Sequence, residues 1–234
     1  MKLCVKLILA KKEMNSDWRR AMLSLIKHLL QSEAPQLYEE YYGEYKTTMK
    51  KFNYSLVLPG AKFADDRIML NSDEIYLYIS SSEKLIMMYF QNALLKKRGK
   101  SFPLQHENSM KIDSVRITKT PDITDSEIIV KMLSPLVVRE HSKDNKDKYY
   151  YYDEEGFLET LQRTLARQLG DTEKVPVVEP VKAKRVVVKA FGGNISCNLG
   201  IFKITGEPSQ LEQLYLNGLG SKSSAGFGAF EIIG

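Results

Sequence analysis

Four glycines and a lysine near the C-terminus are the residues whose types and spacing point most directly to chemistry. They lie in NGLGSKSSAGFGAF, residues 217–230, and are Gly218, Gly220, Lys222, Gly226 and Gly228. Glycine lets a backbone approach a partner closely and adopt positive φ. Successive bare N–H groups can then surround an anion, and a lysine can add its charge. The spacing predicts a phosphate-binding loop that includes Ser223, while the simpler alternative is a flexible hairpin before an edge strand.

Other chemical patterns are missing from the sequence. Lys222 precedes the second glycine pair, so the loop does not match the GxxxxGK[ST] pattern of nucleotide hydrolases. No HExxH or GxSxG motif occurs, and the three histidines and two cysteines have no zinc-ligand spacing. We therefore expect no metal site and no cofactor.

The composition is compatible with a partner that carries negative charge. The chain has 234 residues, enough for one large domain or two of about 100 residues each. Its net charge of +5 permits binding to nucleic acid without requiring it. Cys4 and Cys197 are far apart in the sequence, which favours a reduced, cytoplasmic setting. No apolar run is long enough to cross a bilayer, so we expect no membrane partner.

The glycine spacing also resembles that of the Cas6 family, the endoribonucleases that process CRISPR RNA. The family loop reads G-x-G-x-x-x-x-x-G-x-G, and the four glycines fill all of its glycine positions. Weaker similarities lie in residues 52–55 (FNYS), 133–138 (LSPLVV) and 206–208 (GEP).

This resemblance implies a metal-independent reaction on precursor CRISPR transcripts. The ribose 2′-OH attacks the adjacent phosphate within the repeat and leaves a 2′,3′-cyclic phosphate. Such a step uses a base, an acid and a cation near the phosphate. The resemblance implies CRISPR repeat RNA as the partner, with other Cas proteins and a second copy of the chain as further candidates.

Apolar periodicity predicts the order β-α-β-β-α-β, twice in succession. In the first half we expect strands at 2–10, 51–58, 67–70, 74–79 and 110–118, and helices at 15–32 and 83–97. Residues 37–48 are expected to be irregular, and residues 67–79 to form a hairpin. Helical spacing predicts a core stripe on the first helix, with Lys27 and His28 away from it; its members are Trp18, Met22, Leu25, Ile26 and Leu29. In the helix at 83–97, the residues expected to face inward are Leu85, Met88, Ala93 and Leu94.

The second half shows the same alternation after a linker at 119–126. We expect strands at 127–139, 149–152, 182–191, 195–204 and 230–233, and helices at 154–168 and 208–217. The predicted fold class is α+β, with two tandem ferredoxin-like βαββαβ domains at residues 1–120 and 121–234. The resemblance implies the same duplication, because the Cas6 family is built from two RRM-like folds.

Catalytic candidates come from the region after the first helix. Many Cas6 members are expected to use a histidine there, with a tyrosine and a lysine. Here residues 35–51 contain no histidine. Matching the sequence to the family forward from Pro35 places Tyr42 at the position of the family histidine, and matching it backward from Phe52 places Glu44 there. Either Lys50 or Lys51 fits the family lysine. His28 follows Lys27, which occupies the place of the family tyrosine.

We assign His28, Tyr42 and Lys50 as the candidates for base, acid or positioner, and phosphate stabiliser. An imidazole suits proton transfer near neutral pH. The simpler alternatives are a helix histidine with no role and a tyrosine that covers the sheet. His106 is expected to face solvent, and His141 to lie at a solvated hairpin tip, so neither is a catalytic candidate.

Cations on the predicted strand at 182–191 extend the candidate RNA-binding set. Positive side chains along a strand can follow a nucleic acid backbone. The proposed RNA contacts outside the glycine loop are Lys51, Lys182, Lys184, Arg185 and Lys189, and ordinary surface lysines are the alternative. The RRM aromatic motif is not found.

Three functions stay open at this point. The first is an endoribonuclease that cuts CRISPR repeat RNA. The second is a family member that binds repeat RNA but cleaves it poorly or not at all, because the loop histidine is missing. The third is an unrelated ferredoxin-like protein whose glycine loop binds a nucleotide or a protein subunit.

Overall fold

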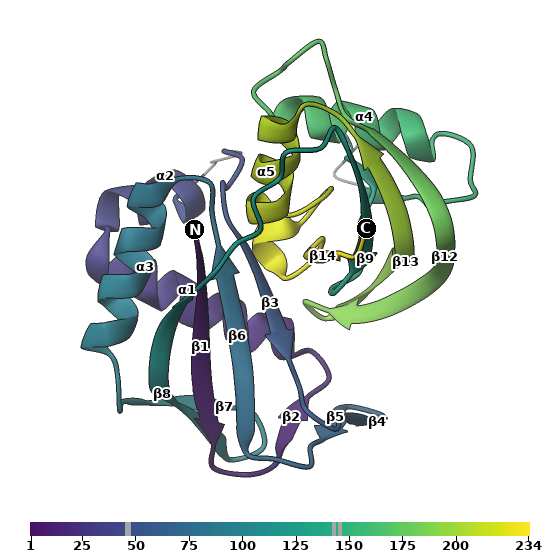
Figure 1. The fold of residues 1–234 in the computed structure, drawn as a ribbon. Helices are drawn as coiled ribbons and strands as arrows, with labels where there is room; N and C mark the ends of the chain where they lie inside the picture. The colour runs from purple at the N-terminus through teal and green to yellow at the C-terminus, as the bar shows by residue number, and fades with distance from the viewer. Residues whose placement is uncertain (45–47, 142–143, 145–146) are drawn as a thin grey trace. The chain divides into compact units, whose positions relative to one another are not determined.

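Two compact units make up this α+β protein, seen in a computed structural model that describes residues 1–44, 48–141, 144 and 147–234 (Figure 1). The first unit consists of Met1–Lys50, Leu56–Thr120 and Lys189–Gly193. The second consists of Lys51–Ser55, Pro121–Val188 and Asn194–Gly234.

A five-stranded sheet with the order β3-β6-β1-β8-β7 forms the centre of the first unit. Its strands are β1 (Lys2–Leu9), β3 (Asn53–Val57), β6 (Glu74–Ser80), β7 (Ser101–Leu104) and β8 (Asn108–Thr118). β1 pairs antiparallel with both neighbours, so that Val5 lies opposite Leu77 on one side and Val115 on the other. Alternate residues of β1 are completely buried, as the period-two pattern predicts.

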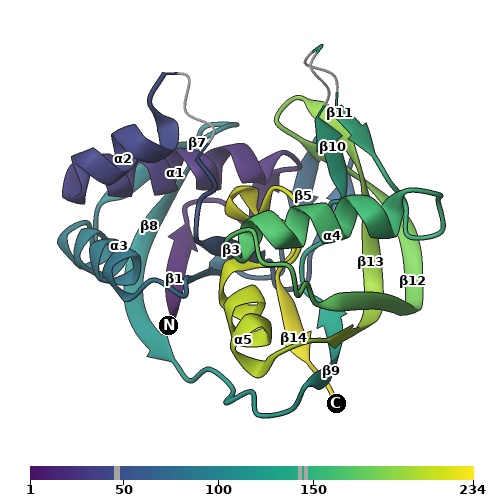
Figure 2. The same cartoon turned by 90° about the horizontal axis from the view of Figure 1, so that it is seen from above.

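Three helices accompany this sheet, and α1 packs against both of the others: α1 (Trp18–Glu33), α2 (Pro35–Tyr42) and α3 (Lys84–Lys96) (Figure 2). The predicted apolar stripe of α1 is confirmed, since Met22, Leu25, Ile26 and Leu29 are all buried. The prediction of an irregular segment over residues 37–48 is wrong for α2. Pro35 ends α1 and also begins α2, because proline is well suited to the first position of a helix.

The predicted inward face of α3 is partly wrong. Leu85 and Met88 are 58% and 54% exposed, whereas Ala93 and Leu94 are buried as predicted. The buried stripe instead begins one residue later, at Ile86. The helix is thus rotated relative to the expected orientation.

A small three-stranded sheet with the order β2-β5-β4 replaces the predicted hairpin over residues 67–79. Its strands are β2 (Glu13–Asn15), β4 (Lys62–Ala64) and β5 (Arg67–Met69). β5 pairs with β2 and β4 rather than with β6, and Ile68 lies opposite Met14. Both of these side chains are buried, so the pairing removes their apolar surface from water.

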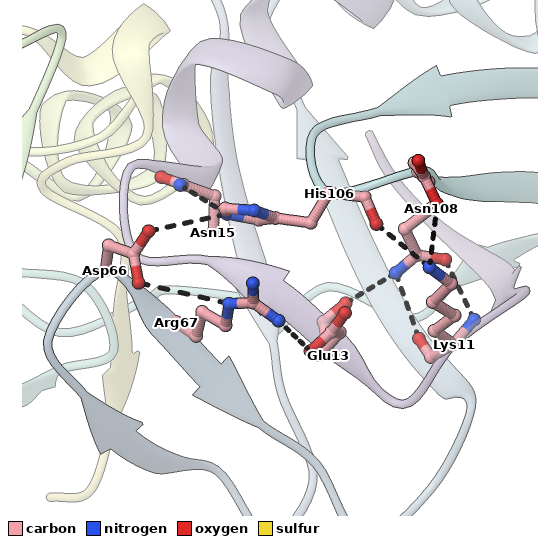
Figure 3. A network of polar contacts seen from close by, with 8 residues as sticks. Lys11, Glu13, Asn15, Asp66, Arg67, His106 and Asn108 are labelled. Carbon is pink, nitrogen blue, oxygen red and sulfur yellow. Dashed lines mark hydrogen bonds and ion pairs between the residues drawn. The ribbon is translucent and has the colours of Figure 1, made fainter.

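A polar network joins β2 to the turn between β7 and β8 (Figure 3). Asn108 is almost fully buried, and its amide donates to the carbonyl oxygens of Lys11 and Glu13. Figure 3 shows His106 between Asn15 and Asp66. The Asn15 oxygen accepts from the Asp17 N–H, so its NH2 group donates to His106 Nε2 at 3.1 Å. His106 is therefore a bonded structural residue, and the expectation that it faces solvent is wrong.

The second unit contains a four-stranded sheet with the order β12-β13-β9-β14. Its strands are β9 (Glu127–Met132), β12 (Val177–Ala190), β13 (Gly193–Thr205) and β14 (Phe230–Ile232), and a separate hairpin joins β10 (Arg139–His141) to β11 (Asp147–Tyr149). Its helices are α4 (Phe157–Gln168), α5 (Pro208–Asn217) and the 3-10 turn η1 (Ser223–Ala225).

The core of the second unit lies between its sheet and its two α-helices. Phe157, Leu161 and Leu165 of α4 and Leu211 of α5 are fully or almost fully buried with the inward residues of β9 and β13. The α4 residues are four apart, which is the spacing of one helix face. This agrees with the helix predicted at 154–168.

Cys4 and Cys197 are both buried, as thiols rather than as a disulfide. Within the described ranges, no helix is both long and apolar enough to span a membrane. The same residues contain no grouping of three or more His, Cys, Asp or Glu side chains of the kind that holds a metal ion.

Candidate functional site

The glycine loop has the backbone conformation that its sequence predicts. Gly218, Gly220, Gly226 and Gly228 have φ values of 83°, 81°, 85° and 73°. A Cβ on Gly220 would lie 2.7 Å from the carbonyl oxygen of Val137. Glycine is required here for both conformation and space.

The N–H groups of these glycines bond within the protein. Gly218 donates to Leu214 O, Gly220 to the side-chain oxygen of Gln168, and Gly228 to Pro135 O. All four glycines are buried. The expectation that bare glycine amides form an anion-binding concavity is therefore wrong, because these amides already have acceptors within the protein.

Asn53 holds the glycine loop in place. Its Nδ2 donates to the carbonyl oxygen of Phe227 at 2.6 Å and to that of Ser223 at 3.0 Å. Asn53 is 3% exposed, so these two acceptors satisfy an amide that is shielded from water. In the sequence, residues 52–55 stand out only by their similarity to the Cas6 family. The structure adds a physical reason for Asn53, because its amide bonds two carbonyl oxygens of the glycine loop.

Lys222 is the cation of the loop, and its side chain is 23% exposed. Its ammonium lies 3.9 Å from a carboxylate oxygen of Asp147. Burial and the positive charge of Arg139 lower the pKa of Lys222, and Asp147 opposes this shift. Lys222 is thus a partly desolvated cation next to one carboxylate.

Tyr42 and Lys50, two of the predicted catalytic residues, lie together in the first unit. Lys50 Nζ is 4.9 Å from the centre of the Tyr42 ring, and Lys27 Nζ of α1 is 4.8 Å from it. Burial, and then the charge of Lys27, lower the pKa of Lys50. Sequence reasoning used Lys27 only as a reference position, and the structure makes it a member of this group.

The Tyr42 hydroxyl is buried, with no hydrogen-bond partner among the residues that the structure describes. Burial, followed by the nearby Tyr41 and Tyr38, raises the pKa of Tyr42, so the hydroxyl stays protonated near neutral pH. A protonated hydroxyl can donate to an oxyanion but is a poor base. Glu44, the other match to the family histidine, is exposed.

His28 lies in different surroundings within the first unit. Its ring packs edge-on against Phe102, with centroids 5.7 Å apart, in a cavity of about 620 Å³ that Lys97 and Lys100 also line. Burial, and then these two lysines, lower the pKa of His28. No described contact joins His28 to Tyr42 or Lys50, so the structure groups two of the three predicted catalytic residues.

A family model described as CRISPR associated protein Cas6, C-terminal, matches residues 118–232. The chain belongs to the Cas6 family. No curated protein matches the sequence.

Solved structures similar to this Cas6 family member span its whole length. One is a RAMP protein described as binding different RNA substrates, with 23% identity, a TM-score of 0.83 and complete coverage of both chains. Another is the product of a Cas6-related gene from Pyrococcus furiosus, with 23% identity, a TM-score of 0.82, and coverage of 100% of this chain and 98% of that one. A Cas6 protein in a product complex has 16% identity, a TM-score of 0.70 and complete coverage of both chains. At these identities the similarities establish the shared fold.

The remaining predicted RNA-binding cations are all exposed. Lys182, Lys184, Arg185 and Lys189 lie on β12, where the residues that are half-buried between them are Ala183, Val186 and Val188. Arg185 is held by Asp153 at 3.0 Å. Lys51 is exposed just before β3. These cations are therefore accessible to a ligand in solution.

Proposed function

We propose that this Cas6 family member binds CRISPR repeat RNA and cleaves it within the repeat, without a metal, by attack of a 2′-OH on the adjacent phosphate. The observation that carries this proposal is the grouping of Lys27 of α1 with Tyr42 and Lys50, in a chain whose family is established. Two ammonium groups beside a protonated phenol match the needs of a phosphorane, which gains negative charge as it forms.

Each member of this group has a distinct proposed role. Lys27 and Lys50 stabilise the charge on the phosphate oxygens, and the Tyr42 hydroxyl donates a hydrogen bond to one of them. The lowered pKa of Lys50 also makes its ammonium a better proton donor to the leaving 5′ oxygen.

His28 is the proposed base for the 2′-OH proton. Its lowered pKa favours the neutral imidazole, which is the form that accepts a proton. His28 directly follows Lys27 on α1, and successive helical residues point about 100° apart. The base therefore reaches the RNA from a different side of the helix than Lys27.

RNA binding without cleavage is the second candidate function. It is favoured by the burial of the Tyr42 hydroxyl and by the packing of His28 against Phe102 rather than against the lysine–tyrosine group. In this case the group anchors the RNA backbone, and the chain acts as a repeat-RNA-binding protein.

We also propose that each unit is a ferredoxin-like domain. The order β3-β6-β1-β8 in the first unit and β12-β13-β9-β14 in the second supports this proposal. In both orders, the first strand of the βαββαβ series lies between the third and the fourth. In the second unit, the glycine loop with Lys222 and Ser223 follows the second helix of this series, and we propose that its side chains contact RNA together with the cations of β12. Other Cas proteins and a second copy of the chain are further proposed partners.

Cleavage of repeat RNA in EDTA tests the proposed function. We expect products ending in a 2′,3′-cyclic phosphate, and slower cleavage by the Lys27→Met and Lys50→Met variants. Lys2→Met is a matched control, because Lys2 also lies over a tyrosine ring, that of Tyr78 at 5.3 Å. Tight binding without product would favour the second function, and equal affinity for DNA and RNA would contradict both.

A further inference from the structure

Four donor side chains converge on Asp147 in the second unit. Both carboxylate oxygens lie 3.0 Å from Arg139 Nη1. One oxygen is also 2.8 Å from His141 Nδ1, and the other is 3.0 Å from the Tyr149 hydroxyl and 3.9 Å from Lys222 Nζ. His141 lies in an exposed hairpin as expected, and its bond to Asp147 makes it part of this cluster as well.

Strand register explains how the cluster forms. In the hairpin of β10 and β11, Arg139 lies opposite Tyr149, and His141 lies opposite Asp147. Residues two apart on paired strands share one face, so all four side chains emerge together. Lys222 arrives from the glycine loop, because the neighbouring Ser221 donates its N–H to Val137 O at 2.8 Å.

The cluster has a net positive charge even though Asp147 offsets one of its cations. Arg139 and Lys222 contribute two positive charges, and Asp147 contributes one negative charge. With a neutral His141 the sum is one positive charge, and with a protonated His141 it is two. The carboxylate engages only one of the Arg139 terminal nitrogens and only Nδ1 of His141. The remaining N–H groups of these side chains can reach an oxyanion.

We propose that Arg139, His141 and Lys222 form a phosphate-binding site for the RNA backbone, positioned by Asp147 and strengthened when His141 gains a proton. This proposal rests on the proposed binding of repeat RNA. His141 is 54% exposed and Arg139 is 30% exposed, so a phosphate can reach both. Asp147 positions the donors and does not itself contact the ligand.

The charge states of the neighbouring groups support this arrangement. Burial alone would raise the pKa of Asp147, but hydrogen bonds from His141, Arg139 and Tyr149 outweigh it and lower the value to about 2. Burial and the bond to Asp147 raise the pKa of Tyr149 to about 12. Between pH 5.5 and 8, Asp147 therefore stays ionised and Tyr149 stays protonated, and His141 is the histidine that bonds directly to this carboxylate.

Binding of fully 2′-O-methylated repeat RNA, which cannot be cleaved, tests this site. For the wild-type protein we expect affinity to increase several-fold from pH 8 to pH 5.5. One additional phosphate contact should also steepen the log–log salt slope by roughly 0.7. His141→Gln should remove both changes. His106→Gln is the matched control, because His106 accepts a hydrogen bond from Asn15 in the first unit and should leave both changes intact.

Two further measurements test the proposed phosphate site independently of the His141→Gln variant. Arg139→Gln should weaken binding at both pH values, and Arg139→Lys should restore only part of it, because a lysine lacks the planar fork. Sulfate, whose charge is constant over this pH range, should shift the His141 ring resonances in the wild-type protein.

Retention of the pH effect and the salt-slope change by His141→Gln would overturn the proposal, as would loss of cleavage by this variant with unchanged RNA affinity. A sulfate response without RNA binding would overturn both this proposal and the proposed function. RNA binding that is insensitive to Arg139→Gln and His141→Gln would overturn the proposed site alone.

Discussion

The side-chain amide of Asn53 lies 2.6 Å from the carbonyl oxygen of Phe227, between segments 174 residues apart in the sequence. The same nitrogen reaches Ser223 O, so one amide holds both the middle and the end of the glycine loop. Gly218 also lies directly against this amide, in a space that a Cβ would fill. The loop is therefore a packed structural element whose shape depends on a residue far upstream in the sequence, within the same compact unit.

Replacement of Asn53 by alanine should destabilise the protein. The change leaves two buried carbonyl oxygens without this donor, and an unsatisfied buried polar group costs about 1–3 kcal/mol. We expect a fall of this size in the free energy of unfolding, measured with urea. Asn194→Ala, at an exposed position of the second unit, is the control and should change stability by less than about 0.5 kcal/mol. Equal stability of the two variants would show that the amide does not hold the loop.

Three glycine-to-alanine variants should separate backbone strain from steric overlap. Gly193 has an ordinary φ and open space, so its variant should be nearly neutral. Gly170 has φ of 88° and open space, so alanine should cost about 1–2 kcal/mol. Gly220 adds contact with Val137 to a φ of 81°, so its variant should be the least stable. Thermal or urea unfolding gives the ranking, and a Gly220 variant as stable as the Gly170 variant would contradict it.

Long periodic segments could be predicted from the sequence, and elements that depend on distant partners could not. The helix predicted at 208–217 has the same bounds in the structure, because Pro208 and Gly218 mark its ends. The pairing of β5 with β2 depends on the burial of Ile68 against Met14, which local turn residues do not encode. The prediction of a hairpin over residues 67–79 is therefore wrong.

For the candidate site, the sequence indicated which residues have special roles more reliably than which of them lie together. Glycine spacing correctly indicated positive φ, but the acceptors that use the glycine N–H groups come from distant segments such as Pro135 and Gln168. Periodicity placed Lys27 and His28 away from the core stripe of α1. It did not indicate that Lys27 turns toward Tyr42 while His28 turns toward Phe102. Those directions depend on α2 and β7, neither of which was predicted.

The cluster at Asp147 predicts a specific loss of stability in acid. The pKa of Asp147 is lowered from 3.8 to about 2 in the folded protein. Its ionised form therefore stabilises the fold fully above about pH 4, and this contribution is lost as pH falls from 3.8 towards 2. Asp147→Asn should cost about 2 kcal/mol at pH 7, and the difference from wild type should shrink across this window. Urea unfolding at several pH values measures it, and a difference that is constant down to pH 2 would contradict the assignment.

Tyr42→Phe should separate folding from chemistry in the lysine–tyrosine group. The hydroxyl is buried without a hydrogen-bond partner in the described part of the chain, so its removal should leave stability unchanged or raise it by about 1 kcal/mol. Tyr76→Phe is the matched control, because its hydroxyl donates to Glu74 at 2.8 Å and its loss should slightly lower stability.

Cleavage should respond in the opposite sense to stability. If the Tyr42 hydroxyl donates to a phosphate oxygen in the transition state, losing a hydrogen bond to a charged group should slow cleavage of repeat RNA about 10- to 100-fold. Single-turnover rates in EDTA at saturating protein measure this effect without a contribution from binding. A Tyr42→Phe variant that is stable and cleaves at the wild-type rate would exclude the hydroxyl from the reaction, and the two lysines alone would then have to stabilise the phosphate.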